Sequence, residues 1–248
     1  MDRSSVIGVI LGIAAIVAGN MLEGGAVSSI IQGTAAAIVF GGTAGATLLS
    51  FPFRDISRAV LSLREVFLDN RPNPERIIRR IIEFSVIGRK SGLIALEAEM
   101  SPRDDPFMRR GIGLAVDGMN PKTLRETLDR EILTYEDERR RVAKVWETAG
   151  GFAPTIGILG AVLGLIQVMQ NVAEPSKLGE GIAVAFVATV YGVGSANLVF
   201  LPLSKKLYNR IDAELTKREL ILEGVLGIQS GENPYYLEQK LRAFLGMG

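Results

Sequence analysis

Gly150–Val172, GGFAPTIGILGAVLGLIQVMQNV, is an unbroken apolar run without an Asp, Glu, Lys, Arg or His. A helix of about 20 residues rises roughly 30 Å, the thickness of a bilayer's hydrocarbon core, so this run is long enough to cross a membrane. Three more stretches share these properties, namely Ser4–Leu22, Val27–Phe53 and Gly181–Leu203. The sequence therefore predicts an all-α integral membrane protein with four transmembrane helices.

The four apolar stretches contain no Asp, Glu, Lys, Arg or His, although ion pumps and proton relays carry such an ionisable group at membrane depth. If this protein handles ions, a partner must supply the titrating group. The chain also lacks Cys and His, which removes thiolate nucleophiles, imidazole bases and the commonest zinc and haem ligands. We expect no enzyme activity, and no catalytic, cofactor-binding or metal-ligating residue. A net charge of +1 without stacking aromatics predicts no nucleic-acid partner.

Basic residues close to the ends of the spans predict the topology. The turn Glu23–Ala26 has no Lys or Arg, and the loop Ala173–Glu180 has only Lys177. The long segment Arg54–Thr148 is rich in arginine, and the C-terminal tail opens with Lys205 and Lys206. Both short loops are therefore predicted outside, and both termini and the long loop in the cytoplasm.

Apolar residues at helical spacing predict four charged helices outside the spans. These are Pro74–Leu96, Phe107–Asp117, Lys122–Trp146, which runs straight into the third span, and Lys205–Leu226, which continues the fourth. The predicted organisation is transmembrane helices 1 and 2 in residues 1–53, a cytoplasmic helical domain in 54–148, transmembrane helices 3 and 4 in 149–204, and a cytoplasmic C-terminal helix and tail in 205–248.

Glycines in the spans recur at a spacing of four residues, which lets helix backbones approach closely in lipid. The pairs are Gly8 and Gly12, Gly41 and Gly45, and Gly160 and Gly164. This pattern fits packing within one chain, and it fits equally oligomerisation or packing around a foreign helix.

Proline and threonine are the other unusual residues of the third and fourth spans. Pro154 and Pro202 each free a carbonyl and predict kinks, which are either structural or a hinge. A hydroxyl such as that of Thr155 or Thr189 is typically satisfied by the carbonyl one turn back, and it less often lines an ion path.

Three motifs resemble the flagellar stator subunits of the MotA/PomA family. Arg89–Glu97, RKSGLIALE, is similar to the family's cytoplasmic R-x-x-G-L-L-x-L-E signature. Pro154–Leu165, PTIGILGAVLGL, and Ala183–Gly192, AVAFVATVYG, are similar to its third-span and fourth-span motifs. The resemblance covers nearly the whole chain.

The resemblance implies a stator subunit in the bacterial cytoplasmic (inner) membrane that couples inward ion flow to flagellar rotation. Such subunits form a homopentamer around two MotB-type chains, each with a membrane aspartate and a peptidoglycan-binding domain, and drive the rotor protein FliG. Arg89 and Glu97 would be rotor-contacting charges. Eight residues apart, they would lie within about 80° of each other on one helix. Pro154, Ala161, Thr189 and Pro202 would belong to the ion pathway and its conformational coupling.

The transported ion is predicted to be the proton. Sodium-type relatives carry a threonine where this chain has Ala161, and losing that hydroxyl removes an oxygen that would coordinate a dehydrated cation. A sodium-driven PomA-type stator is the alternative. Another is a TolQ- or ExbB-like energising subunit, although those relatives have a single span before the cytoplasmic segment. A structural scaffold would leave the Arg89–Glu97 motif without a purpose, and a lone channel lacks a polar stripe.

Overall fold

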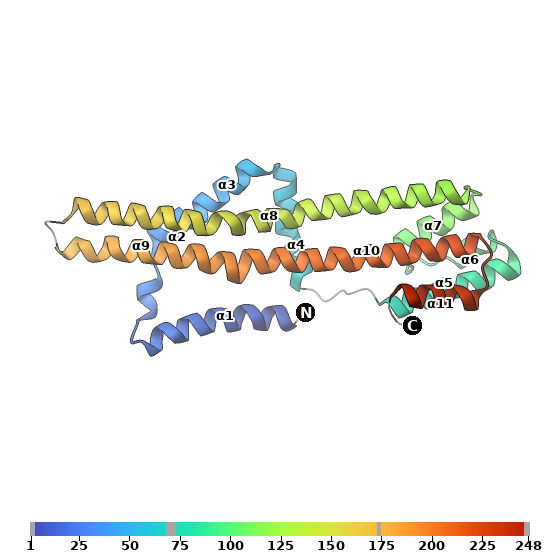
Figure 1. Cartoon of the computed structure of the whole chain (residues 1–248), viewed down its shortest axis with the longest axis horizontal. Helices are drawn as coiled ribbons and strands as arrows, with labels where there is room; N and C mark the ends of the chain where they lie inside the picture. Colours follow the sequence, from blue (N-terminus) through green and yellow to red (C-terminus); the bar gives the residue numbers. More distant parts are fainter. Residues whose placement is uncertain (1–2, 68–72, 173–174, 246–248) are drawn as a thin grey trace. The chain divides into compact units, whose positions relative to one another are not determined.

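The computed structural model describes residues 3–67, 73–172 and 175–245 (Figure 1). Within these ranges every regular element is a helix, which confirms the predicted all-α fold. The elements in chain order are α1 (Arg3–Leu22), the 3₁₀ turn η1 (Val27–Ile30), α2 (Gly33–Ala36), the π-helical turn η2 (Ala37–Gly41), α3 (Gly42–Ser50), α4 (Phe53–Phe67), α5 (Pro74–Ser91), α6 (Ala95–Glu99), α7 (Pro106–Val116), α8 (Pro121–Gln170), α9 (Pro175–Ser195), the π-helical turn η3 (Ala196–Phe200), α10 (Leu201–Gln229) and α11 (Pro234–Phe244).

In the part of the chain that the structure describes, four helical segments are long and apolar enough to cross a membrane, as predicted. They are Ser4–Leu22, Val27–Ser50, Pro121–Gln170 and Leu178–Gln229. The last two are longer than the apolar runs because α8 begins in the charged segment before the third span, and α10 carries the fourth span on into the charged tail. Ala173 and Glu174, from the predicted outer loop, lie outside the described residues.

The chain divides into two compact units. The first unit comprises residues 1–70 and 140–209 and includes all four apolar runs, and the second unit comprises residues 71–139 and 210–248. The predicted boundaries at residues 53, 148 and 204 refer instead to the membrane surface and stay a prediction.

In the second unit, α5, α7 and α11 each begin at an Asn or Asp followed by proline. The Asn73, Asp105 and Asn233 side chains accept hydrogen bonds from the amides of Arg76 (3.3 Å), Phe107 (2.9 Å) and Tyr235 (3.0 Å). Such caps satisfy amides that have no partner within the helix, and proline fits the next position because it has no amide hydrogen. Local sequence therefore fixes where α5, α7 and α11 start.

The second unit has a core of large aliphatic and aromatic side chains. Fully buried members come from α5, α6, α7, α8, α10 and α11, and they are Ile78, Ile81, Phe84, Leu96, Ile112, Leu124, Leu128, Leu220, Ile221, Leu237 and Leu241. Burial of such side chains contributes about 1.5–3 kcal/mol each before the entropic cost of folding. This core holds the surface segments that carry the predicted rotor charges.

The predicted helix Pro74–Leu96 is wrong at its C-terminal end. α5 stops at Ser91, because Gly92 has φ 84°, a left-handed conformation that ends helices and that glycine adopts without strain. A separate short helix, α6, follows at Ala95–Glu99.

Candidate functional site

The third and fourth spans pack backbone against backbone, as α8 and α9 run side by side (Figure 1). A Cβ placed on Gly192 would lie 2.6 Å from the carbonyl oxygen of Ala153, and one on Gly157 would lie 2.8 Å from that of Ala188. Real Cβ atoms do not approach so closely. The helices meet at a distance that only glycine allows at these two positions, so the pair forms a tight hairpin.

The three glycine pairs of the sequence behave differently. A Cβ on Gly164 would lie 2.8 Å from the Gly181 carbonyl oxygen, and one on Gly160 would lie 2.8 Å from Ala188 Cβ, so this pair packs within the chain. A Cβ on Gly12 would lie 3.0 Å from Leu198 Cδ2, whereas built Cβ atoms on Gly8, Gly41 and Gly45 meet nothing within 4 Å among the described residues. Internal packing therefore explains the third-span pair and Gly12, and oligomerisation or a foreign helix stays open for Gly8, Gly41 and Gly45.

The two proline segments lie next to each other. Pro154 lies inside α8 and has no amide hydrogen to donate to the Gly150 carbonyl one turn earlier. A Cβ on Gly150 would lie 2.7 Å from Leu201 Cδ2, and Leu201 immediately precedes Pro202. Leu201 also ends the π-helical turn η3, since its amide donates to Ala196 O. The turn of α8 that lacks a backbone hydrogen bond at Pro154 therefore contacts the end of the π-helical turn η3 in the fourth-span helix. Both irregular turns are compatible with a kink or a hinge.

A junction that the sequence did not predict joins the part of α8 two to three turns before Pro154 to the residues on either side of Pro202. Trp146 stacks on Phe200 with ring centroids 6.0 Å apart, and its Nε1 donates to Ala59 O at 3.1 Å. The buried Ser204 hydroxyl donates to Ala143 O at 3.1 Å. The lone tryptophan of the chain was the available signal, because a buried indole N–H generally finds an acceptor.

Ala161 and Thr189 are half-buried in α8 and α9. Ala161 lies two helical turns beyond Pro154, so both are on one face of α8 about 10 Å apart along its axis. Thr189 Oγ1 donates to Ala185 O at 3.2 Å, and Thr155 Oγ1 donates to Phe152 O at 2.8 Å. Both threonines are thus satisfied by their own helices, and among the described residues no polar contact joins Thr189 to Pro154 or Ala161.

Tyr191 is a polar anchor of the fourth span that sequence reasoning passed over. Its hydroxyl donates to Ile30 O at 2.7 Å and accepts from the Gln32 amide at 3.2 Å, and its ring stacks on Phe40 with centroids 5.8 Å apart. The hydroxyl therefore satisfies backbone groups between η1 and α2, where no helix supplies a partner. A tyrosine within an apolar run was the signal for such a contact.

Arg89 and Glu97 are both exposed, but they do not share a helix as predicted. Arg89 lies in the last turn of α5 and Glu97 lies on α6, on opposite sides of the break at Gly92. The predicted angle of 80° assumed one continuous helix and does not apply. Their relative placement depends instead on whatever holds α6 against α5.

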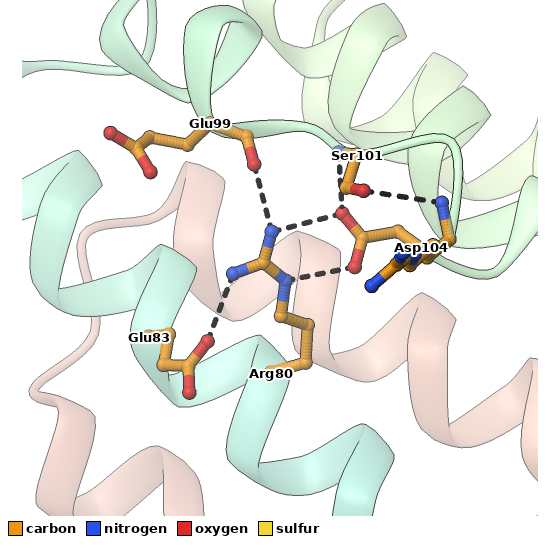
Figure 2. A network of polar contacts seen from close by, with 6 residues as sticks. Arg80, Glu83, Glu99, Ser101 and Asp104 are labelled. Carbon is orange, nitrogen blue, oxygen red and sulfur yellow. Dashed lines mark hydrogen bonds and ion pairs between the residues drawn. The ribbon is translucent and has the colours of Figure 1, made fainter.

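Arg80 on α5 makes the polar contacts that hold this segment (Figure 2). Its Nε and Nη2 lie 2.9 Å from the two carboxylate oxygens of Asp104, and Nη2 also donates to Glu99 O at 2.8 Å. Nη1 donates to Glu83 at 2.9 Å. Asp104 accepts a further bond of 2.8 Å from the Ser101 amide. A bidentate arginine–carboxylate pair is among the strongest side-chain contacts.

The electrostatics of this network favour the charged forms. Burial alone would raise the pKa of Asp104, but the hydrogen bonds from Arg80 and the Ser101 amide, with the nearby positive charges, lower the pKa below its ordinary value. The hydrogen bond to Asp104 raises the pKa of Arg80, against an opposing effect of burial. Both groups are therefore ionised at neutral pH.

The described residues offer no cluster of three or more His, Cys, Asp or Glu side chains that could hold a metal ion. The apolar runs have no side chain that gains or loses a proton near neutral pH. What the site provides is a close-packed, uncharged helix hairpin with two adjacent proline segments, together with two opposite charges on an exposed surface of the second unit. These features define a multi-span helical membrane protein whose apolar segments supply no acid of their own.

Known proteins share this arrangement along the whole chain. Residues 100–220 match the model of the MotA/TolQ/ExbB proton channel family. Residues 6–90 match the model of the motility protein A N-terminal region. Motility protein A of Bacillus subtilis is 35% identical over 99% of this chain and 91% of its own length, and that of Helicobacter pylori is 34% identical over 100% and 96%.

Solved structures agree. The C. jejuni MotAB structure matches with a TM-score of 0.93 at 32% identity, covering 98% of this chain and 96% of the matched one. The flagellar MotAB stator complex of Bacillus subtilis matches with a TM-score of 0.92 at 34% identity, with the same coverage. The chain therefore belongs to the motility protein A (MotA) family, within the MotA/TolQ/ExbB proton channel family.

Proposed function

We propose that this chain is the MotA-type subunit of a flagellar stator, which couples inward ion flow to torque on the rotor. The observation that carries the proposal is the uncharged α8–α9 hairpin, in a chain that matches solved MotAB complexes over 98% of its length. The match of residues 6–90 to the motility protein A N-terminal region favours a stator over a TolQ- or ExbB-like subunit.

A MotB-type partner with one span and a peptidoglycan-binding domain supplies the missing acid. Moving one charge through 100 mV is worth about 2.3 kcal/mol, roughly four times thermal energy. Protonation of the partner's aspartate removes the cost of a charge in an apolar ring, so each loading step changes which neighbouring subunit is preferred. The adjacent segments around Pro154 and Pro202 are the part of this chain best suited to bend at each step.

Assembly follows from the apolar surface of the single chain. No residue in the α1 span is buried, and large apolar side chains are exposed on α8 and α9. Examples are Ile158, Leu159, Val162, Leu163, Ile166, Met169, Ile182, Phe186, Val190 and Val193. Other copies in a homopentamer, two partner spans and membrane lipid would cover these faces. The complex lies in the bacterial inner membrane, with both termini and the long loop in the cytoplasm.

Protons are the proposed ion, with sodium as the alternative. The Ala161 side chain has no oxygen to offer a dehydrated cation, in contrast to the threonine of sodium-type relatives. Swimming speed at fixed membrane potential is expected to be independent of external sodium, and a rise with sodium would favour a PomA-type stator.

The rotor contact through Arg89 and Glu97, with FliG as the partner, is tested by double charge reversal. The variant Arg89→Glu with Glu97→Arg should abolish swimming while membrane levels stay at wild type, because both side chains are exposed and outside the core. A matched control reverses Arg103, which is also exposed in the second unit and lies outside the motif. Wild-type swimming by the double variant would contradict the assignment.

A further inference from the structure

We propose that Arg80 and Asp104 are positioning residues for the rotor contact, which fix the segment carrying Glu97 against the helix carrying Arg89. This inference rests on the proposed function. Arg80 and Asp104 lie outside the Arg89–Glu97 motif. Their proposed role is to fix the position of Glu97 relative to Arg89, which the motif residues do not fix by themselves.

The need for a positioning contact comes from the break at Gly92. α6 has only five residues, far fewer than an isolated helix needs for stability in water. Its single buried residue is Leu96, which is fully buried, whereas Ile94 is 77% exposed. A single buried side chain holds a short helix against the core but does not fix the rotation of the helix about that contact. Glu97 is the residue next to that anchor, so its direction depends on a second point of attachment.

Arg80 supplies this second attachment from α5, the helix that also carries Arg89. Its guanidinium donates a hydrogen bond of 2.8 Å to the carbonyl of Glu99, the last residue of α6. It also donates hydrogen bonds of 2.9 Å to both carboxylate oxygens of Asp104 in the loop that follows. These contacts and the bond to Glu83 engage four of the five guanidinium N–H groups. A planar guanidinium bound on several sides resists rotation, which a single contact does not.

The Arg80–Asp104 pair is also partly shielded from solvent, which helps to keep its geometry fixed. The Arg80 side chain is 25% exposed and that of Asp104 is 10% exposed, so solvent competes little for the pair. The guanidinium also lies 4.2 Å from the ring centroid of Phe84, which is fully buried. The neighbouring Asp105 is anchored separately, because it caps α7 and binds Lys217 at 2.8 Å. Loss of the Arg80–Asp104 pair would therefore loosen the segment between Leu96 and Asp105 without detaching either end.

Glu83 offers a matched control within the same network. It binds Arg80 at 2.9 Å, but it lies on α5 three residues away and so ties nothing to the loop. Removing its charge weakens the network by one partner and leaves the contacts to Glu99 and Asp104 in place. If the network served stability alone, neutralising Asp104 or Glu83 should have similar effects on torque. If it positions Glu97, only the loss of the Asp104 charge should lower torque.

The experiment measures geometry and torque on the same variants of the whole stator complex. The chain has no cysteine, so Lys90→Cys with Ala98→Cys places two spin labels on exposed sites beside, not at, the proposed contact charges. Labelled chains are diluted with unlabelled ones so that only distances within a chain are read. Asp104→Asn should broaden the distance distribution and lower stall torque several-fold at wild-type membrane levels, and Glu83→Gln should change neither.

Arg80→Lys keeps the charge but loses the bidentate geometry, and intermediate broadening with intermediate torque is expected. If Asp104→Asn fails to accumulate in the membrane, Arg80→Lys takes its place in the comparison with Glu83→Gln and is held to the same two criteria. Unchanged distances in Asp104→Asn, or equal broadening in Glu83→Gln, would overturn the proposal. Broadened distances with normal torque would overturn the link to the rotor. Failure of the rotor assignment itself is read separately, from swimming by the Arg89 and Glu97 reversal.

Discussion

The α8–α9 hairpin and the second unit are held together by opposite means. In the hairpin, helices touch through backbone at Gly157, Gly164 and Gly192, and no ionisable side chain takes part. In the second unit, large side chains such as Phe84 fill the core, and ion pairs such as Arg80–Asp104 fix the surface. Lipid gives helices no hydrophobic drive to associate, so close contact must replace it, whereas water supplies that drive directly.

The two regions therefore suit different parts of the function. An uncharged, tightly packed hairpin has no group of its own to bind a proton, so the titrating acid must come from elsewhere. The second unit presents opposite charges on an exposed surface, which suits recognition of another protein. Substitutions that disrupt the large-residue core of the second unit or the glycine contacts of the hairpin test this contrast.

The largest effect is expected from a cavity in the second unit. Phe84→Ala should destabilise that unit by about 3–5 kcal/mol, because the ring is fully buried and the variant leaves a void. Hydrogen exchange of the α5 amides in the detergent-solubilised complex measures the change. Phe244→Ala is the control, since Phe244 is 46% exposed on α11. Equal protection in both variants would show that this unit is not held by its core.

A smaller loss is expected from one added methyl group in the hairpin. Gly192→Ala would place Cβ 2.6 Å from Ala153 O, which forces the helices apart and costs about 1–3 kcal/mol. The melting temperature and membrane level of the complex should fall, and swimming with them. Gly194→Ala lies two residues along the same helix, where a Cβ meets nothing within 4 Å, and it should behave as wild type. Indistinguishable variants would refute the close-packed hairpin.

The smallest effect is expected from acid, and only in the second unit. The pKa of Asp104 is lowered by folding, so its contacts stabilise the folded form above the ordinary carboxyl pKa and are lost as pH falls through the folded value. Exchange of the loop amides, corrected for intrinsic rates, should rise below about pH 4. Asp104→Asn should flatten that rise, whereas a rise of the same size would assign it to other groups.

Much of the architecture could be predicted from local sequence. The four apolar runs predict the spans, and α5 and α11 begin at Asn-Pro pairs. The end of α5 was also readable, because Arg89 and Lys90 precede Gly92 in the pattern typical of a helix C-terminus. It was missed because the Arg89–Glu97 motif was treated as one helix.

The remaining features depend on residues far apart in the chain, which a single sequence does not bring together. Arg80 and Asp104 are 24 positions apart, and Trp146 and Ala59 are 87 apart. Gly157 and Gly192 fall outside the glycine pairs spaced by four. Counting alanine as a small residue reveals Gly181–Ala185 and Ala188–Gly192, which is the signal that was available.

Ion conduction by the purified chain in sealed vesicles tests most directly whether the acid comes from a partner. With a membrane potential imposed, the chain alone should pass no proton or sodium current, and co-reconstitution with a MotB-type partner should produce one. Replacement of the partner's membrane aspartate by asparagine should abolish that current. Robust conduction by the isolated chain would contradict this division of roles, because none of its apolar runs holds an Asp, Glu, Lys, Arg or His to carry the ion.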